Sequence, residues 1–422
     1  IEEAPSSITN YELRRTIWDA AITIARKIGY VNAGTVEFLV DRDGKFYFLE
    51  MNTRIQVEHP VTEFITGLDM VELQIGIASG KPLPYRQEDI RQNGHAIECR
   101  IYAEDAGNNF LPSPGPVWQY HEPEGPGIRV DSSISGKTSI GSEFDPMIAK
   151  LVCHGESRGE ARLKAVAALG EFIAAGCTTN IEFLRGTLMH PAFIENEIST
   201  SFCEQHRKEI LDELHRQKKE YPAEDVLAAF LLADFNVCYG KNIWCSVGYW
   251  RDIMQLGVRI EEAGMIIPIA FSSRKLIRFR YRGKEFEAVL HKLTDGRAEF
   301  SINGQYHTAF VSYEDPGLAW VTMNGIHFTV ERKDRLHSEI LADTPEHANA
   351  GEDQVTAPMF GKLTQILVKE NEPVKKGQVL AIVEAMKMEN LITARKDARV
   401  EKIYLNAGQT VETNSIILKY HT

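Results

Sequence analysis

The C-terminal part of the chain consists of two copies of one short segment. Residues 355–383 align with residues 392–420 without a gap, at an offset of 37 positions. Apolar residues match across the two copies: Val355 with Ile392, Leu363 with Val400, Ile366 with Ile403, Val368 with Leu405 and Val374 with Val411. They recur at the spacing of β-strands, and Asn-Glu-Pro, Lys-Lys-Gly and Asn-Ala-Gly separate them as turns. The repeat predicts a small, flattened antiparallel β-sandwich.

Lys387 lies at the centre of this repeat, between Met386 and Met388. The junction of the two copies should be an exposed hairpin, where a single lysine is ordinarily only a solvated charge. Flexible apolar side chains beside it are more typical of a recognition surface. The pattern therefore favours a recognised lysine over a plain surface charge.

The segment Glu384-Ala-Met-Lys-Met-Glu-Asn390, with Ala357-Pro-Met359 upstream, resembles the biotinyl (biotin carboxyl carrier) domain of biotin-dependent carboxylases. The resemblance implies that Lys387 carries biotin in amide linkage. The linkage removes the charge of the lysine and turns its side chain into a long swinging arm. Lipoyl domains share the duplicated fold, but they usually place an acidic and a small residue beside their lysine.

Length and composition exclude several classes of protein. At 422 residues the chain has room for about two to four domains. Its net charge of −12 argues against nucleic acid as the main partner and against anionic membranes, and no apolar run is long enough to span a bilayer. The six cysteines are scattered without a Cys-x-x-Cys pair, which indicates reduced thiols and a cytoplasmic location, or the mitochondrial matrix in a eukaryote.

Near the N-terminus, two apolar strands at residues 34–40 and 45–51 are joined across Asp43-Gly44, which is the signal for a two-residue type I′ hairpin turn. In that register Glu37 faces Glu50. Two like charges opposed on a ladder are destabilising, so a cation is the simplest neutraliser. Asn52 projects to the same face, and two carboxylates with one amide suit Mg²⁺ on a nucleotide. The alternative is an exposed hairpin whose acids face water.

Four polar residues alternate with apolar ones beyond Glu50 and share one face of an extended chain: Asn52, Arg54, Gln56 and Glu58. An arginine fork suits a carboxylate-like anion, and a nearby carboxylate can act as a general base. The row therefore predicts an anion-binding site with its own base.

The stretch from Glu50 to Glu63 resembles the signature of the ATP-grasp biotin carboxylases. The resemblance implies a set of roles, which are Mg²⁺ (or Mn²⁺) held on ATP by Glu37, Glu50 and Asn52, and bicarbonate held by Arg54, Gln56 and the backbone of Val57. It also implies that Glu58 deprotonates bicarbonate for attack on the γ-phosphate of ATP.

Arg100 matches the arginine that stabilises the biotin enolate in this family. Taken alone, it reads as an ion-pair partner of Glu98 on the same strand face. The segments 110–115 and 144–150 also fit the C-terminal domain of the carboxylase, so the likeness covers residues 1 to about 212.

The family's N-terminal half, with its glycine-rich phosphate lid, has no counterpart here. Gly136-Lys-Thr138 does not form a P-loop, because Asp131 stands where the motif needs a glycine. We therefore expect the chain to be the C-terminal part of a longer polypeptide and to be inactive by itself. Cys153-His154 lies in an apparent strand, where neighbouring side chains point to opposite faces, so we expect packing rather than nucleophilic catalysis.

The middle of the chain predicts a charged helix over residues 209–221 and a second, apolar helix that starts at Pro222. β-Hairpins follow, with turns at Arg282-Gly283, Asp295-Gly296, Asn303-Gly304 and Asn324-Gly325. The pattern predicts a barrel wrapped on a helix. By its position, this region resembles the linker domain that mediates subunit contact in acyl-CoA carboxylases with a separate transferase subunit.

About 135 residues separate the carboxylase part from the carrier part, whereas a TIM barrel needs roughly 250. The carboxyl transfer should therefore occur on a separate carboxyltransferase β subunit, in a hetero-oligomer. The turn-rich residues 342–354 predict a tether that spans on the order of 20 Å on average and roughly 45 Å when extended.

The sequence predicts a multidomain α/β and β protein with four segments. They are the end of an ATP-grasp unit plus the carboxylase C-terminal domain (1–212), the linker domain (213–341), the tether (342–354) and the biotinyl sandwich (355–422). The expected function is that of the alpha subunit of a biotin-dependent acyl-CoA carboxylase, with acetyl- or propionyl-CoA favoured, ATP and bicarbonate as substrates, and biotin protein ligase as a further partner. A methylcrotonyl-CoA carboxylase alpha subunit and a non-catalytic carrier or assembly protein are the alternatives.

Overall fold

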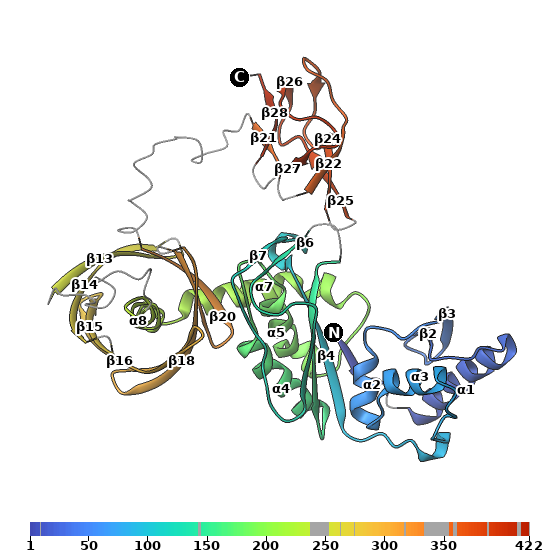
Figure 1. Ribbon diagram of the computed structural model, residues 1–422. Helices are drawn as coiled ribbons and strands as arrows, with labels where there is room; N and C mark the ends of the chain where they lie inside the picture. Colours follow the sequence, from blue (N-terminus) through green and yellow to red (C-terminus); the bar gives the residue numbers. More distant parts are fainter. Residues whose placement is uncertain are drawn as a thin grey trace.

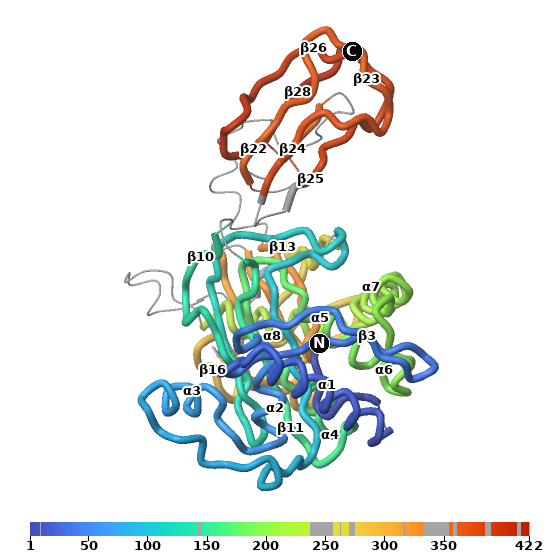
Figure 2. Tube along the Cα trace, turned by 90° about the vertical axis from the view of Figure 1, so that its right-hand side faces the viewer, coloured from blue at the N-terminus to red at the C-terminus, as the bar shows by residue number. Residues whose placement is uncertain are grey.

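The computed structural model describes residues 1–8, 10–141, 145–236, 253–261, 263–273, 275–315, 318–332, 354–357, 361–385, 388–411 and 415–421. Three parts follow one another along the chain: a mixed α/β part, a β-barrel around a helix, and a small C-terminal β unit (Figures 1 and 2). The described chain is rich in β-structure, with one closed barrel of eight strands.

The N-terminal segment is a short run of helices and a two-stranded hairpin. Its elements are β1 (Glu2–Ala4), α1 (Tyr11–Ile28), β2 (Thr35–Val40), β3 (Phe46–Asn52), α2 (His59–Thr66) and α3 (Met70–Ala78). Helix α1 starts at the Asn10 cap and ends at Gly29, which adopts the left-handed φ of 66°. Trp18, Phe48 and Leu49 are exposed in this segment, which is the mark of an apolar contact surface.

The β2–β3 register places Glu37 opposite Glu50, as predicted, but the predicted turn is wrong. At the closed end Val40 pairs with Phe46, and the backbone N–H of Asp41 bonds the carbonyl of Lys45, so the loop holds three residues instead of two. A β-bulge between Glu37 and Phe38 restores the expected pairing of the two glutamates. The bulge compensates for the longer loop.

A four-stranded antiparallel sheet in the order β1-β4-β11-β9 organises the next segment. The elements are β4 (His95–Tyr102), β5 (Glu104–Asp105), β6 (Leu111–Pro112), β7 (Gly115–Val117), β8 (Gln119–His121), β9 (Ile128–Ser132), β10 (Thr138–Ile140), β11 (Met147–Gly155), α4 (Arg158–Glu171), β12 (Ile173–Ala175), α5 (Ile181–Met189), α6 (Pro191–Ile194) and α7 (Phe202–Glu220), with 3₁₀ turns at Gln87–Asp89 and Ala106–Asn108. One face of the sheet packs on α4 and α5 in a core that includes Ile97, Cys99 and Leu151.

The opposite face of this sheet carries charge. Arg100, Lys150 and Asp131 lie side by side on β4, β11 and β9, with Lys150 as the Cα partner of both neighbours. Glu98 lies two residues before Arg100 and shares its face. Helix α2 packs against β4 and β11 on this side, where Val61 and Ile65 contact Ala96 and Val152. The charged residues therefore lie beneath the segment that joins β3 to α2.

Cys153 is fully buried in the core of the first part, and burial raises the pKa of its thiol to about 12. The prediction of a packing role is confirmed, because a thiol with so high a pKa is not a ready nucleophile.

Strands β13 to β20 form the closed barrel, and Figure 1 shows α8 (Ala223–Asp234) inside the ring. The strands are β13 (Ile253–Ile260), β14 (Ala263–Ser273), β15 (Leu276–Tyr281), β16 (Lys284–Thr294), β17 (Arg297–Ile302), β18 (Gln305–Asp315), β19 (Leu318–Met323) and β20 (Ile326–Arg332). Every residue of α8 from Val226 onward is buried, as expected of a helix that is apolar on all sides. The preceding helix α7 starts at Phe202, seven residues before the predicted start, and runs through the expected boundary at residue 212.

The four predicted hairpin turns of the barrel are confirmed. In each of them two residues separate the paired strand ends, as between Tyr281 and Lys284. Both central residues of each turn have positive φ, for example 47° at Arg282 and 79° at Gly283. This is the geometry of a type I′ turn, which only glycine and a few other residues adopt readily.

The barrel packs directly on the first part of the chain. Trp118 and Trp320 meet edge to face with ring centroids 5.7 Å apart, and Phe310 contacts Ile173 and Ala175. The Glu182 carboxylate accepts a 2.8 Å hydrogen bond from the backbone N–H of His327. These contacts combine an apolar seam with directed polar bonds.

The C-terminal unit consists of two four-stranded sheets, ordered β21-β28-β26-β23 and β25-β24-β22-β27. Its strands are β21 (Gln354–Thr356), β22 (Gly361–Ile366), β23 (Pro373–Val374), β24 (Val379–Ala385), β25 (Met388–Thr393), β26 (Ala398–Ile403), β27 (Thr410–Val411) and β28 (Ile416–Tyr420). The bounds of β22 and β26 differ by 37 residues at both ends, as do those of β23 and β27, so the predicted repeat is confirmed. Residues 386 and 387 stand between β24 and β25 in the sequence, and Lys387 lies outside the described residues.

Candidate functional site

Four polar side chains, two carboxylates and two amides, meet at the open end of the β2–β3 hairpin. The amide nitrogen of Asn52 donates to Glu37 Oε1 and to Glu50 Oε1, each at 2.9 Å. Gln56 Nε2 donates to the same oxygen of Glu37 at 2.8 Å. The two carboxylates are thus held together by neutral amides, which do not cancel their charge.

This donor set fits a hard divalent cation. Glu37 and Glu50 supply two carboxylates on adjacent strands, and Asn52 offers its carbonyl oxygen after half a turn of its terminal amide. Mg²⁺ accepts such ligands and keeps open positions for water and phosphate. The predicted metal ligands are therefore brought together.

Glu58 and Arg100 form an ion pair on the charged face of the sheet. Arg100 Nη2 donates to Glu58 Oε2 at 2.8 Å and to Glu2 at 3.3 Å, whereas its Nε lies 3.8 Å from Glu98. The ion pair of Arg100 with Glu98 that the sequence suggested is present, but Glu58 lies a full ångström closer to the guanidinium. Neither Glu58 nor Arg100 is fully buried, so both are accessible to a small anion.

Arg54 does not join this pair in the structure. Its side chain is exposed, and its Nη1 donates to the backbone carbonyl of Ile55 at 3.1 Å. Gln56 is directed to Glu37. Of the predicted bicarbonate-binding residues, Gln56 contacts Glu37, and the carbonyl of Val57 contacts Lys150 on the charged face of the sheet. The guanidinium of Arg54 bonds the neighbouring backbone instead.

Glu98 is a buried acid that sequence reasoning treated only as a partner of Arg100. Its side chain has no exposed area, and neither carboxylate oxygen has a hydrogen-bond partner. Burial raises the pKa of Glu98 to about 7, while the charges of Lys150 and Arg100 oppose the shift. A carboxylic acid on a strand between apolar neighbours is the signal that could have revealed it.

Lys150 is a further residue that was not assigned a role. Its Nζ donates to the backbone carbonyl of Val57 at 2.8 Å and lies 3.3 Å from Asp131. Arg129 pairs with Asp131 at 2.8 Å and with Glu63 of α2 at 2.7 Å. Burial favours the neutral form of Asp131, but the hydrogen bond from Arg129 and the charge of Lys150 hold its pKa below the ordinary value.

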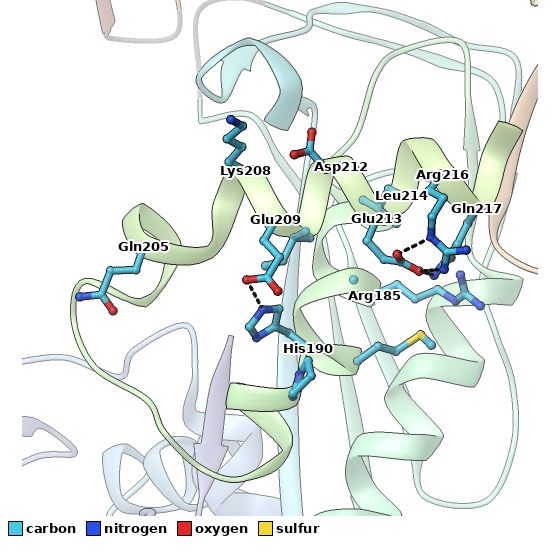
Figure 3. Close-up of a pocket in the computed structure, with 14 residues that line it drawn as sticks. Arg185, His190, Gln205, Lys208, Glu209, Asp212, Glu213, Leu214, Arg216 and Gln217 are labelled. Carbon is cyan, nitrogen blue, oxygen red and sulfur yellow. Dashed lines mark hydrogen bonds and ion pairs between the residues drawn. The ribbon is translucent and has the colours of Figure 1, made fainter.

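A separate group consists of His190, His206 and Glu209, and two of its members, His190 and Glu209, line a pocket of about 860 Å³ beside α7 (Figure 3). Its ligand atoms lie within 4.8 Å of one another. However, His190 Nδ1 accepts a hydrogen bond from the backbone N–H of Ala192, so its Nε2 carries the ring proton and faces Glu209 at 3.3 Å. A proton on Nε2 prevents that nitrogen from binding a metal. His190 therefore acts as the N-cap of α6, with Glu209 as the carboxylate partner of its ring.

Comparison with known families assigns most of the chain to three models. Residues 1–86 match the ATP binding domain of the carbamoyl-phosphate synthase L chain, residues 98–205 match the biotin carboxylase C-terminal domain, and residues 353–420 match the biotin-requiring enzyme family. The last match includes Lys387.

Whole relatives align with nearly all of the chain. The human mitochondrial propionyl-CoA carboxylase alpha chain is 35% identical over 433 residues, with 99% of this chain and 59% of the relative covered. The chain is thus similar in sequence to the alpha chain of a propionyl-CoA carboxylase. The methylcrotonoyl-CoA carboxylase subunit alpha of Arabidopsis thaliana is 33% identical, with 99% and 62% covered. The chain thus spans about three fifths of the length of the carboxylase relatives it matches.

A solved structure of the biotin carboxylase subunit of pyruvate carboxylase is also similar. It is 42% identical with a TM-score of 0.48, and the match covers 49% of this chain and 46% of that one. Among the helices of the described residues, none has the length and apolar character needed to cross a membrane.

Proposed function

We propose that the chain is part of the alpha subunit of a biotin-dependent acyl-CoA carboxylase. It would take part in the ATP- and bicarbonate-dependent carboxylation of biotin linked to Lys387, which then carries the carboxyl group to a separate carboxyltransferase β subunit. The observation that carries this proposal is the Glu58–Arg100 pair of 2.8 Å, in which Glu58 follows the Glu37, Glu50 and Asn52 set by six residues. An arrangement of this kind holds a base, an anion-binding cation and a metal site together.

The roles of the side chains follow from their chemistry. Glu58 accepts the proton of bicarbonate, whose oxygen attacks the γ-phosphate of ATP, so that the bond to the β-phosphate breaks and ADP leaves. Arg54 binds the bicarbonate oxygens once its guanidinium leaves the carbonyl of Ile55, and Gln56 and the Val57 backbone complete that subsite. Glu37, Glu50 and Asn52 would hold Mg²⁺ (or Mn²⁺), which would supply positive charge to the phosphates of ATP. Arg100 holds the developing negative charge of the acceptor ureido group.

The division of the chain at residues 1–212, 213–341, 342–354 and 355–422 remains part of this proposal. The barrel around α8 would be the linker domain that contacts the β subunit, and the first part would be the end of an ATP-grasp unit with the carboxylase C-terminal domain. The two-sheet unit would be the biotinyl sandwich. Packing of the barrel on the first part through Trp118 and Trp320 supports a fixed arrangement of these two segments.

For the acceptor we propose acetyl- or propionyl-CoA, with methylcrotonyl-CoA as the alternative. The similarity to propionyl-CoA and methylcrotonoyl-CoA carboxylase alpha subunits is close to equal, at 35% and 33%. Biotin protein ligase would attach the biotin, in the cytoplasm or in a mitochondrial matrix, and the working assembly would be a hetero-oligomer with the β subunit. Copurification with that subunit and comparison of the three acyl-CoA substrates decides between them.

The remaining rival is a carrier or assembly protein without catalytic activity. The two predict different results for ATP cleavage by the full-length protein. A carboxylase should cleave magnesium-ATP only when bicarbonate is present and faster when free biotin is added, whereas a carrier should show no such cleavage. Absence of bicarbonate-dependent cleavage in a biotin-saturated assay would refute the proposed function.

A further inference from the structure

Lys150 is an unusual residue for its position. It lies in the middle of β11, a strand whose other described residues from Ile148 to Cys153 are buried and apolar. Its own side chain is only 12% exposed. A lysine in such a place has to satisfy its charge and its three donors locally. The groups that the Lys150 ammonium contacts therefore indicate its role.

The main partner is the backbone carbonyl of Val57, which accepts from Nζ at 2.8 Å. The peptide that joins Val57 to Glu58 is planar, so holding its oxygen also holds the plane from which Glu58 continues. No other side-chain hydrogen bond to this carbonyl is found in the described part of the chain. Lys150 therefore links the sheet to the base.

The second partner keeps the ammonium in place. Asp131 lies 3.3 Å from Nζ, and Arg129 bridges Asp131 to Glu63 on α2. The segment from Val57 to Glu63 is thus tied to the sheet at both ends, once through Lys150 and once through Arg129. On its other side Lys150 is the cross-strand neighbour of Arg100, which binds Glu58 directly.

We infer that Lys150 is a positioning residue for bicarbonate activation, acting on Glu58 through the Val57 carbonyl. This inference rests on the proposed function, because it assigns a role within the same reaction. The described contacts of Lys150 are with Val57 and Asp131 and not with Glu37, Glu50 or Asn52. It fixes the direction in which Glu58 presents its carboxylate, and its loss should affect bicarbonate more than ATP.

The test compares three variants of the full-length protein. Lys150→Met keeps the apolar stem and removes the donor, and Lys150→Arg restores a charged donor. Lys164→Met is the matched control, because Lys164 is also a partly exposed lysine that donates to a backbone carbonyl, that of His154 at 2.6 Å, away from the site. Initial rates of ATP cleavage are measured against bicarbonate and against magnesium-ATP.

We expect Lys150→Met to lower kcat/KM for bicarbonate about tenfold or more, with the KM for magnesium-ATP changed less than about twofold. Lys150→Arg should recover most of the loss, and Lys164→Met should behave like the unmodified protein. Equal losses in the Lys150→Met and Lys164→Met variants, or an unchanged kcat/KM for bicarbonate, would overturn the inference.

Amide hydrogen exchange of residues 54–63 separates this inference from the proposed function. Lys150→Met should speed exchange in that segment, and Lys164→Met should not. Unchanged exchange in Lys150→Met would overturn the positioning role even if activity fell. An unmodified protein without bicarbonate-dependent ATP cleavage would instead refute the proposed function.

Discussion

Arg100 donates a 2.8 Å hydrogen bond to the carboxylate of Glu58, so the expected base and the expected anion-stabilising cation are already paired. When Glu58 takes a proton it loses its charge, and Arg100 loses its nearest anionic partner. In the proposed reaction, protonation of Glu58 would therefore free Arg100 to bind the negative charge that develops on biotin.

Glu58→Gln should remove the base and preserve the shape of the site. We expect bicarbonate-dependent ATP cleavage to fall about 10²–10⁴-fold, because the amide cannot accept the proton. Nucleotide binding should stay nearly unchanged, since the metal-binding set of Glu37, Glu50 and Asn52 is intact. Isothermal titration with magnesium-ATP and a steady-state rate assay measure the two quantities, and undiminished turnover would rule out the base role.

Lys387→Arg should abolish biotinylation, because arginine keeps the charge but cannot form the amide. Protein from a host with active biotin ligase is probed with streptavidin and by intact mass. The chain that keeps Lys387 should show the mass increase of one biotinyl group, and the Lys387→Arg variant should show none. Lys376→Arg, at an exposed lysine of the same unit, serves as the control and should stay labelled.

Glu98 should make the stability of the first part depend on pH. Its pKa is raised from 4.5 to about 7 by burial, so the folded protein holds this proton more tightly than the unfolded chain does. The bound proton of Glu98 therefore adds to the free energy of unfolding. This addition is fully present below pH 4.5 and is lost as the pH rises through about 7.

Glu98→Gln should remove this pH dependence. Because the amide carries no charge at any pH, the variant should be more stable than the unmodified protein at pH 8, by up to about 3 kcal/mol. The difference should shrink towards pH 5. Urea denaturation at several pH values measures it, with the exposed Glu124→Gln as the control. A difference that does not vary with pH would contradict the assignment.

The barrel should depend on one buried ion pair. Arg332 Nη1 lies 2.5 Å from Asp234 at the end of α8, and both side chains are almost fully buried. Arg332→Met removes the guanidinium that faces the buried Asp234 carboxylate and should cost about 3–5 kcal/mol of unfolding free energy. The exposed pair of Arg278 and Glu287 provides the comparison, and Arg278→Met should cost less than about 1 kcal/mol. Urea denaturation followed by tryptophan fluorescence tests both, and similar losses would contradict the role of burial.

The hairpin of Glu37 and Glu50 shows how far sequence reasoning reaches. Alternation and the Asp43-Gly44 signal correctly placed the two acids opposite each other. The loop is one residue longer than predicted, and a bulge at Glu37 and Phe38 compensates for it. Local turn signals do not determine such bulges, because they depend on how the two strands pack as a pair.

The contacts on the charged face of the sheet could not be predicted from the sequence. Alternation along β4 and β11 places Arg100 and Lys150 on one face, but their partners Glu58 and Val57 lie 42 and 93 residues earlier in the chain. Only the fold brings Val57 and Glu58 over that face. The hairpin turns of the barrel were predictable because their signal is entirely local, as at Arg282-Gly283.

The C-terminal unit has a consequence for how it can assemble. Its two copies exchange their shortest strands, because β23 pairs with β26 of the second copy and β27 pairs with β22 of the first. One copy alone would leave a sheet edge open and would associate with a second molecule to close it. The duplicated segment therefore behaves as a covalently joined pair of protomers, and cutting the chain between the copies should yield two pieces that bind each other.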